Sequence, residues 1–194
     1  ALKALLLTMG AVTLSWFRFL SAAILLLIWL RWRNKLPTQA MLKGSGWKLL
    51  AVCVAGLIGN YLFYLWSVDR ISAAGAQVLI QMAPLLLLLG SVWLFKESFS
   101  KGQWIGVLLF SIGLALFFNQ RLMNLAGNPD FIPGALLMLV ASIAWAGYAL
   151  AQKSLLRKME SPAIMMLIYF AASLLLLPNV HLSEAATLTT LGIG

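Results

Sequence analysis

Polar side chains inside a long apolar run are the first candidates for a functional site. Gln77 and Gln81 lie four residues apart within the run 72–95, so they share one face of a helix. Pro84 follows on nearly the same face, where it removes the hydrogen bond to the carbonyl of Ile80 and predicts a bend in the helix. Because amides and a freed carbonyl need partners away from lipid, these residues should face a polar cavity or another helix. In a cavity they would meet water or a substrate.

Aromatic and amide side chains in two other apolar runs favour the same chemistry. Asn60 and Tyr64 stand one helical turn apart in the run 49–67 and present the same choice between a cavity and a helix contact. Trp145, Tyr148 and Gln152 follow at i, i+3 and i+7, which places them on one helix face. That face could stack aromatic or cationic substrates, or its Tyr and Gln could simply approach the membrane interface.

Two charged residues need an explanation of their own. Arg18 lies inside the apolar run 11–30, and charges within a membrane are functional candidates because they are costly there. It would attract an anionic group of a substrate, pair with Asp69, or reach the outer membrane surface. Glu97 stands at a helix boundary beside Lys96 and Lys101. It would either close the cytoplasmic end through a structural ion pair or take part in proton coupling.

The sequence offers no set of residues for catalysis. It contains one His and one Cys, and no phosphate-binding loop or cluster of metal ligands is found in it. We therefore expect no catalytic residue, no metal site, no cofactor and no enzymatic activity. Two functions remain: transport of a small molecule, and a structural or accessory role in which the polar residues only join helices.

The apolar runs must position these side chains. Of the 194 residues, 62% are hydrophobic and only 10% are charged, and the apolar residues form long runs instead of alternating with polar ones. The runs are long enough to span a bilayer as helices and too long for barrel strands. They cover 11–30, 49–67, 72–95, 103–119, 132–151 and 162–178. The chain is thus predicted to be an all-α, polytopic transmembrane helix bundle.

The run 103–119 carries two local signals. Ser100 and Gln103 have the spacing of a capping box, which predicts that a helix begins there. Gly102, Gly106 and Gly113 form a small-residue stripe, which lets helices pack closely in lipid. These glycines, like Glu97, are assigned a gating or structural role.

The basic residues account for topology. A net charge of +9 could suggest a nucleic-acid partner, but Lys and Arg lie between the apolar runs. Most of them occur in the loops 31–48, 96–102 and 153–161, whereas the alternate connections hold few. By the positive-inside rule these three loops are cytoplasmic, and no nucleic-acid partner is expected.

The two ends of the chain are related to each other. At a shift of 150 residues, KALLLTMGAVTLSWFRFLSAAILLL aligns with KSLLRKMESPAIMMLIYFAASLLLL. Lys3 matches Lys153, Met9 matches Met159 and Ala22 matches Ala172, while Arg18 is replaced by Ile168. The shift spans five helices, so the two segments have opposite orientations, as in transporters built from inverted repeats. The chain has no initiator Met and stops as TLTTLGIG turns apolar, so we expect a piece of a longer protein.

These segments resemble the EamA-domain form of the drug/metabolite transporter superfamily. The resemblance covers nearly the whole chain and is most specific in TLSWFRFLSAA and in AAGAQVLIQMAPLLLLLGSVWLFKESFSKGQWIGVLLFSIGLAL. It is carried by Arg18, Ala73, Ala74, Pro84, Glu97, Gly106 and Gly113. GALLMLVASIAWAGYALAQKSL resembles the first helix of the family's second repeat, whereas Gly10 and Ala11 stand where many members carry a proline.

The resemblance implies a ten-helix fold of two inverted five-helix repeats. Residues 1–119 would form the first repeat, with its first helix truncated, and residues 132–194 would begin the second. Such proteins move small metabolites, often outward, without ATP, which implies an alternating-access exporter in a bacterial inner membrane. Its partners would be a small-molecule substrate, the lipid bilayer, a coupling ion or proton, and a second copy in a homodimer. The substrate cavity would be lined by Arg18, Asn60, Tyr64, Gln77, Gln81, Pro84, Trp145 and Tyr148.

Overall fold

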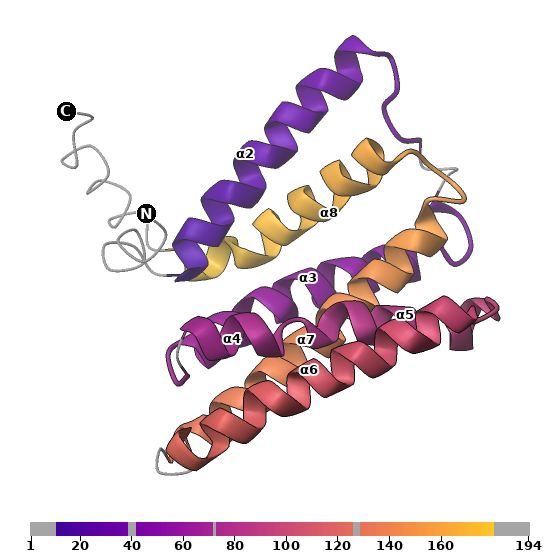
Figure 1. Ribbon diagram of the computed structural model, residues 1–194. Helices are drawn as coiled ribbons and strands as arrows, with labels where there is room; N and C mark the ends of the chain where they lie inside the picture. Colours follow the sequence, from indigo (N-terminus) through magenta and orange to yellow (C-terminus); the bar gives the residue numbers. More distant parts are fainter. Residues whose placement is uncertain (1–10, 39–41, 72, 126–128, 181–194) are drawn as a thin grey trace. The chain divides into compact units, whose positions relative to one another are not determined.

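All regular secondary structure that the computed structural model describes is helical (Figure 1). The described residues are 11–38, 42–71, 73–125 and 129–180. Within them, 5 spans are long and apolar enough to cross a membrane, and a shorter apolar helix covers Lys101–Leu116. The six predicted runs all coincide with helices, which confirms the prediction of a polytopic all-α chain. Lys3 and the other residues of 1–10 and 181–194 lie outside the described part.

The chain divides into two compact units. One is Gly59–Leu150, and the other combines Ala1–Ile58 with Ala151–Gly194. The helices α3 (Gly46–Val68) and α7 (Phe131–Leu155) run from one unit into the other. The unit Gly59–Leu150 also holds α4 (Ala73–Leu79), α5 (Met82–Phe95) and α6 (Lys101–Leu125).

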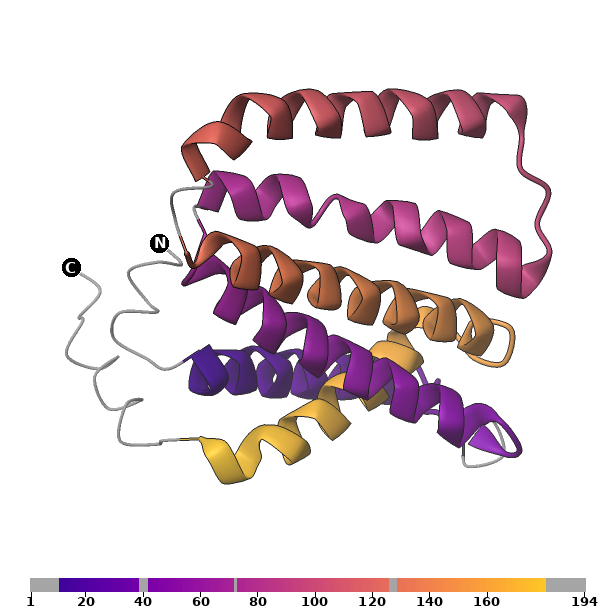
Figure 2. The ribbon, with the colours of Figure 1, turned by 90° about the horizontal axis from the view of Figure 1, so that it is seen from below.

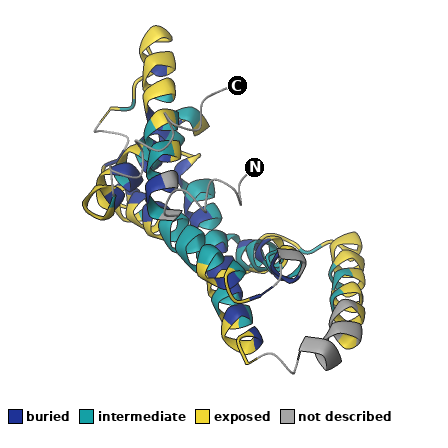
Figure 3. Cartoon of the chain, turned by 90° about the vertical axis from the view of Figure 1, so that its left-hand side faces the viewer, coloured by how far each residue is buried: buried dark blue, intermediate teal, exposed yellow. Residues whose placement is uncertain are grey.

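The core of the unit Gly59–Leu150 joins α4 to the start of α7. Its buried residues are Ile71, Ala76, Leu79, Phe131, Met138 and Ala141. Near the same end, the buried Ser67 hydroxyl of α3 donates a 2.7 Å hydrogen bond to the carbonyl of Gly134 in α7. By contrast, most side chains of α6 between Lys101 and Leu116 are exposed, as suits a helix that faces lipid (Figure 3).

The third membrane span is broken in the middle, as Pro84 predicts. α4 ends at Leu79 and α5 begins at Met82, and the two helices follow one another along one line (Figure 2). At the break, the amide of Gln81 donates to the carbonyl of Val78 at 3.2 Å, and the amide of Ala83 donates to the carbonyl of Ile80 at 2.9 Å. The expectation that Pro84 leaves the Ile80 carbonyl without a backbone donor is therefore wrong, because the chain tightens to a three-residue turn. The carbonyls of Gln77 and Leu79 instead lose the amides that a regular helix would supply.

Close helix contacts occur at other glycines than those predicted. A Cβ atom at Gly134 would lie 2.6 Å from Cγ2 of Ile71, and one at Gly90 would lie 2.6 Å from Cδ1 of Leu150. At Gly106 and Gly113, a Cβ atom would meet no described atom within 4 Å. The predicted stripe therefore makes no close contact within the described residues. The capping box that precedes it is confirmed, since Ser100 and Gln103 exchange backbone-to-side-chain hydrogen bonds of 2.8 and 3.2 Å.

The other unit is organised around an antiparallel helix pair. It consists of α2 (Ala11–Trp32), α8 (Ser161–Leu176) and a short 3-10 helix, η2 (Leu177–Asn179). Leu30, near the end of α2, packs against Ala163 and Met166, near the start of α8. Towards the middle of both helices, the rings of Phe19 and Tyr169 stack with centroids 5.6 Å apart.

Two connecting loops meet at one end of this helix pair. Nζ of Lys35, after α2, forms a 2.6 Å ion pair with Oε1 of Glu160, before α8. Nζ of Lys158 also donates to the carbonyl of Lys43 at 3.5 Å and to Oγ of Ser45 at 3.3 Å. The loops 31–48 and 153–161 therefore lie on the same side of the membrane, as the distribution of basic residues requires. Their assignment to the cytoplasm stays a prediction.

Candidate functional site

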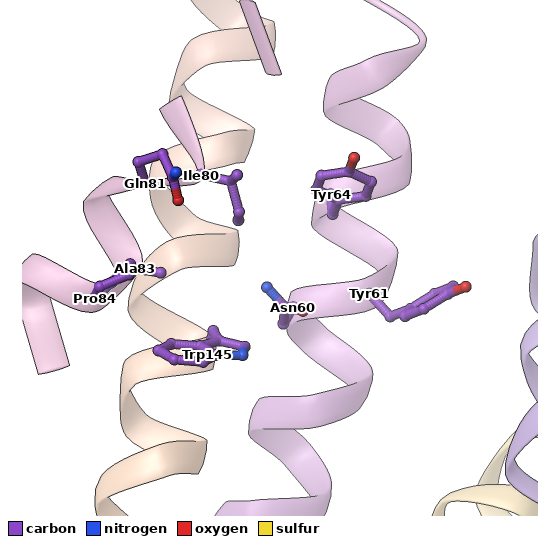
Figure 4. Close-up of a pocket in the computed structure, with 8 residues that line it drawn as sticks. All are labelled: Asn60, Tyr61, Tyr64, Ile80, Gln81, Ala83, Pro84 and Trp145. Carbon is purple, nitrogen blue, oxygen red and sulfur yellow. The ribbon is translucent and has the colours of Figure 1, made fainter. Parts of the chain in front are cut away.

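A cavity of about 340 Å³ opens beside the break between α4 and α5 (Figure 4). This volume lies within the range of small-molecule binding sites. All the residues that line it belong to the unit Gly59–Leu150, and they come from α3, the α4–α5 break, the first turn of α5, and α7. They are Asn60, Tyr61, Tyr64, Ile80, Gln81, Ala83, Pro84 and Trp145.

Asn60 both lines the cavity and ties its walls together. Its Nδ2 donates a 2.9 Å hydrogen bond to the carbonyl of Ala141 in α7. In Figure 4, Asn60 on α3 and Trp145 on α7 point toward one another. A side-chain amide has two N–H groups and a carbonyl, so the contact with Ala141 leaves hydrogen-bonding capacity for a ligand. The same residue can thus hold the helices in register and bind a substrate.

The predicted glutamine pair lies at the break itself. Gln81 lines the cavity and two adjoining hollows of about 460 and 380 Å³ between the α4–α5 span and α6. Gln77 lines only the smaller of these hollows, and its Nε2 donates to the hydroxyl of Tyr64 at 3.2 Å. Gln81 therefore lies at a cavity, while Gln77 joins α4 to α3, and a role of either residue in substrate binding stays a prediction.

The chemistry of the cavity is neutral and aromatic. None of its lining residues is charged, and three of them carry aromatic rings: Tyr61, Tyr64 and Trp145. Amides and hydroxyls can exchange hydrogen bonds with a substrate, and the rings offer apolar faces for stacking. Such a site suits a small organic molecule that has both hydrogen-bonding groups and an apolar part.

The remaining predicted residues lie elsewhere. Arg18 is exposed on α2, in the other unit, and Glu97 is exposed in the connection between α5 and α6. Tyr148 is buried on α7 and is not among the residues that line the cavity. Gly106 lines the larger of the two hollows beside α6, and Gly113 lines the smaller. The functions assigned to these residues stay predictions.

Three lining residues were not predicted: Tyr61, Ile80 and Ala83. Ile80 directly precedes Gln81, and Ala83 directly precedes Pro84. The helix break predicted at Pro84 could therefore have indicated both residues. Tyr61 carries no such signal, because aromatic residues are common in membrane helices. Within the described residues there is also no group of three or more His, Cys, Asp or Glu side chains that could hold a metal ion.

Known proteins identify the family of the chain. Residues 1–119 match the model of the EamA-like transporter family. The chain is 34% identical over 193 residues to an uncharacterized transporter of Haemophilus influenzae, covering 100% of this chain and 63% of that protein. It is also 34% identical over 180 residues to the uncharacterized inner membrane transporter YhbE of Escherichia coli, covering 92% of this chain and 56% of that protein.

A more distant relative is the aromatic amino acid exporter YddG of Ancylobacter novellus. It is 24% identical over 111 residues, which is 57% of this chain and 39% of that protein. No solved structure matches the chain significantly. The chain spans less than two thirds of the length of the relatives that it matches.

The family match covers more than half of the chain and agrees with its membrane-spanning helices and its resemblance in sequence. The chain belongs to the EamA-like transporter family.

Proposed function

We propose that this chain is the larger part of an alternating-access exporter of small organic metabolites in a bacterial inner membrane, and that it has no enzymatic activity. The cavity at the α4–α5 break carries the proposal, because it joins neutral polar groups and aromatic rings at an interruption of a membrane helix. Irregular backbone is tolerated at membrane depth where it lines a cavity, and broken helices form the substrate sites of many carriers. Membership of the family and the names of the related transporters support the same function.

The repeat organisation belongs to this proposal. Residues 1–119 would be the first inverted repeat and residues 132–194 the beginning of the second. The antiparallel packing of α2 and α8, one from each segment, is what two inverted repeats require. The loops 31–48, 96–102 and 153–161 would face the cytoplasm. We also expect a coupling ion or proton and a homodimer. No contact among the described residues bears on either expectation.

A structural or accessory protein is the second candidate function. Its support comes from the hydrogen bonds of Asn60 to Ala141 and of Gln77 to Tyr64, which join helices whatever the cavity does. A scaffold, however, needs no water-accessible cavity. Access of water to this space therefore separates the two functions.

The test uses single cysteines in the full-length transporter. Asn60→Cys, Tyr64→Cys, Gln81→Cys and Trp145→Cys are made with the native Cys53 replaced by Ser. We expect each introduced thiol to react with a charged thiol reagent and each reaction to slow when an exported substrate is added. Leu108→Cys is the control, because Leu108 is 60% exposed on the apolar face of α6 and should stay unreactive in lipid.

Export is measured in the same variants, as efflux of candidate metabolites from cells that express the transporter at equal levels. Metabolites with an aromatic or apolar part are tested first, because they suit the lining of the cavity. If all four cysteines are fully protected from the reagent, and export does not exceed that of cells without the transporter, the structural function is favoured and the transport function is overturned.

A further inference from the structure

The helices α2 and α8 occupy equivalent places in the two segments that align at a shift of 150 residues. Phe19 corresponds to Tyr169 in this alignment. These two residues also stack on each other in the structure, with ring centroids 5.6 Å apart and an interplanar angle of 11°. Where two segments are related by a two-fold axis, equivalent residues meet on the axis, so this stack is the contact that such an axis requires.

The α2–α8 interface is antiparallel, which agrees with a two-fold axis near this stack. Leu30 of α2 packs against Ala163 and Met166 at the start of α8. A two-fold axis near Phe19 and Tyr169 then requires the end of α8 to lie against the start of α2. The 3-10 helix η2, which continues α8, contacts α2, and Figures 1 and 2 both show the end of α8 beside the beginning of α2. The pair is therefore a self-complementary contact between the two proposed repeats.

One end of this pair carries an ion pair whose two residues are not repeated in the alignment. Lys35 and Glu160 form an ion pair, whereas the residues aligned with them at the shift of 150 are Ala185 and Gly10. Neither of these residues has a charged side chain. The alignment therefore does not repeat the two charges of this ion pair.

The backbone holds both partners of the ion pair in place. Asn34 has φ 52°, and the amides of Asn34 and Lys35 donate back to the carbonyls of Arg31 and Leu30, which turns the chain sharply after α2. Glu160 occupies the N-cap position of α8, where the helix dipole favours a negative charge. Lys35 and Glu160 are therefore presented by helix ends and not by freely moving loops.

We propose that the α2–α8 pair is the pivot of the alternating-access motion and that the ion pair of Lys35 and Glu160 is a latch at one end of it. The proposal rests on the alternating-access function proposed above. Repeats that rock about a two-fold axis keep their contacts on the axis, so the stack of Phe19 on Tyr169 persists in both states. An ion pair that forms only when this end is closed favours the closed state of that end. For a half-exposed ion pair this bias is up to about fivefold.

The pivot is tested by bridging cysteine pairs in the full-length transporter with a short, reducible bifunctional thiol reagent, after Cys53→Ser. Bridging Phe19→Cys to Tyr169→Cys should leave export within about twofold of the unbridged protein, because the contact does not open. Bridging Lys35→Cys to Glu160→Cys should abolish export, and reduction should restore it. If export is lost only when the cysteines at positions 19 and 169 are bridged, the pivot is overturned. If the variants show no export even before bridging, the proposed transport function is contradicted instead.

The latch is tested without transport, from distances between spin labels. Trp32 and Leu156 are 82% and 48% exposed and flank the ion pair, so labelled cysteines at these positions report the opening of that end. Lys35→Gln should raise the fraction of the longer distance by up to about fivefold. Lys35→Glu combined with Glu160→Lys should restore the native fraction, because it remakes the pair with the charges exchanged.

Lys43→Gln is the matched control, since it removes a charge from the same loop while Lys43 contributes only its backbone carbonyl to Lys158. Labels at Ser21 and Phe170, exposed positions near the stack, should report one distance in every variant. If the spin labels at positions 32 and 156 report a single distance, and Lys35→Gln leaves that distance unchanged, the latch is overturned. Two distances at Ser21 and Phe170 would overturn the pivot, whether or not a substrate has been found.

Discussion

Replacement of Pro84 by alanine tests whether the broken helix belongs to the transport path. Pro84 has no N–H with which to bond the carbonyl of Ile80, and Ala83 supplies that bond instead. Alanine would restore the donor at position 84, and the carbonyls of Gln77 and Leu79 would regain their regular partners. A proline in a helix interior is about 3 kcal/mol less favourable than alanine, so the continuous helix gains about 100-fold in its equilibrium with the broken one.

The consequence reaches the cavity because Gln81 lies in the break. Closing the break winds Gln81 into a regular helix and changes the position of a side chain that lines the cavity and both adjoining hollows. We expect Pro84→Ala to lower export by about tenfold or more while expression and membrane insertion stay normal, since alanine is well tolerated in helices. Amide hydrogen exchange at residues 80–83 should slow in the same variant.

The matched control is Pro133→Ala. Pro133 stands in the first turn of α7, where an N–H has no partner within the helix, so this change restores no hydrogen bond. It should leave exchange at residues 80–83 and export unchanged. If Pro84→Ala also leaves both unchanged at equal expression, the proline only fits a curved helix against its neighbour, and the reasoning is refuted.

Two further predictions concern the contacts that hold the unit Gly59–Leu150 together. Gly134→Ala should destabilise the protein by about 1–3 kcal/mol, because its Cβ would lie 2.6 Å from a methyl group of Ile71 and 3.0 Å from Cβ of Arg70. Gly106→Ala has open space around it and should leave unfolding in detergent unchanged, so equal stabilities of the two variants would contradict the observed packing. Asn60→Leu should cost about 1 kcal/mol of stability through loss of its bond to Ala141 and also weaken substrate binding; a loss of stability with unchanged binding would assign Asn60 to structure alone.

The elements of this chain could be read from its sequence because membranes impose local rules. Each span must satisfy its own backbone hydrogen bonds and cover the apolar thickness of the bilayer, so apolar length and loop charge determine where helices lie. The capping box at Ser100 and the break near Pro84 are likewise consequences of a few neighbouring residues. The relation between Phe19 and Tyr169 was present in the sequence as a shift of 150 residues, but their contact was not.

The pairing of helix faces was decided only by the tertiary structure. Helices in lipid gain little from the hydrophobic effect when they associate, so their contacts depend on shape and on hydrogen bonds between residues far apart in the chain. A stripe of small residues shows where a helix could approach another, yet the close approaches occur at Gly90 and Gly134 and not at Gly106. Asn60 could be recognised as a polar residue that needs a partner, but its bond to Ala141, 81 residues away, appears only when α3 and α7 are packed together.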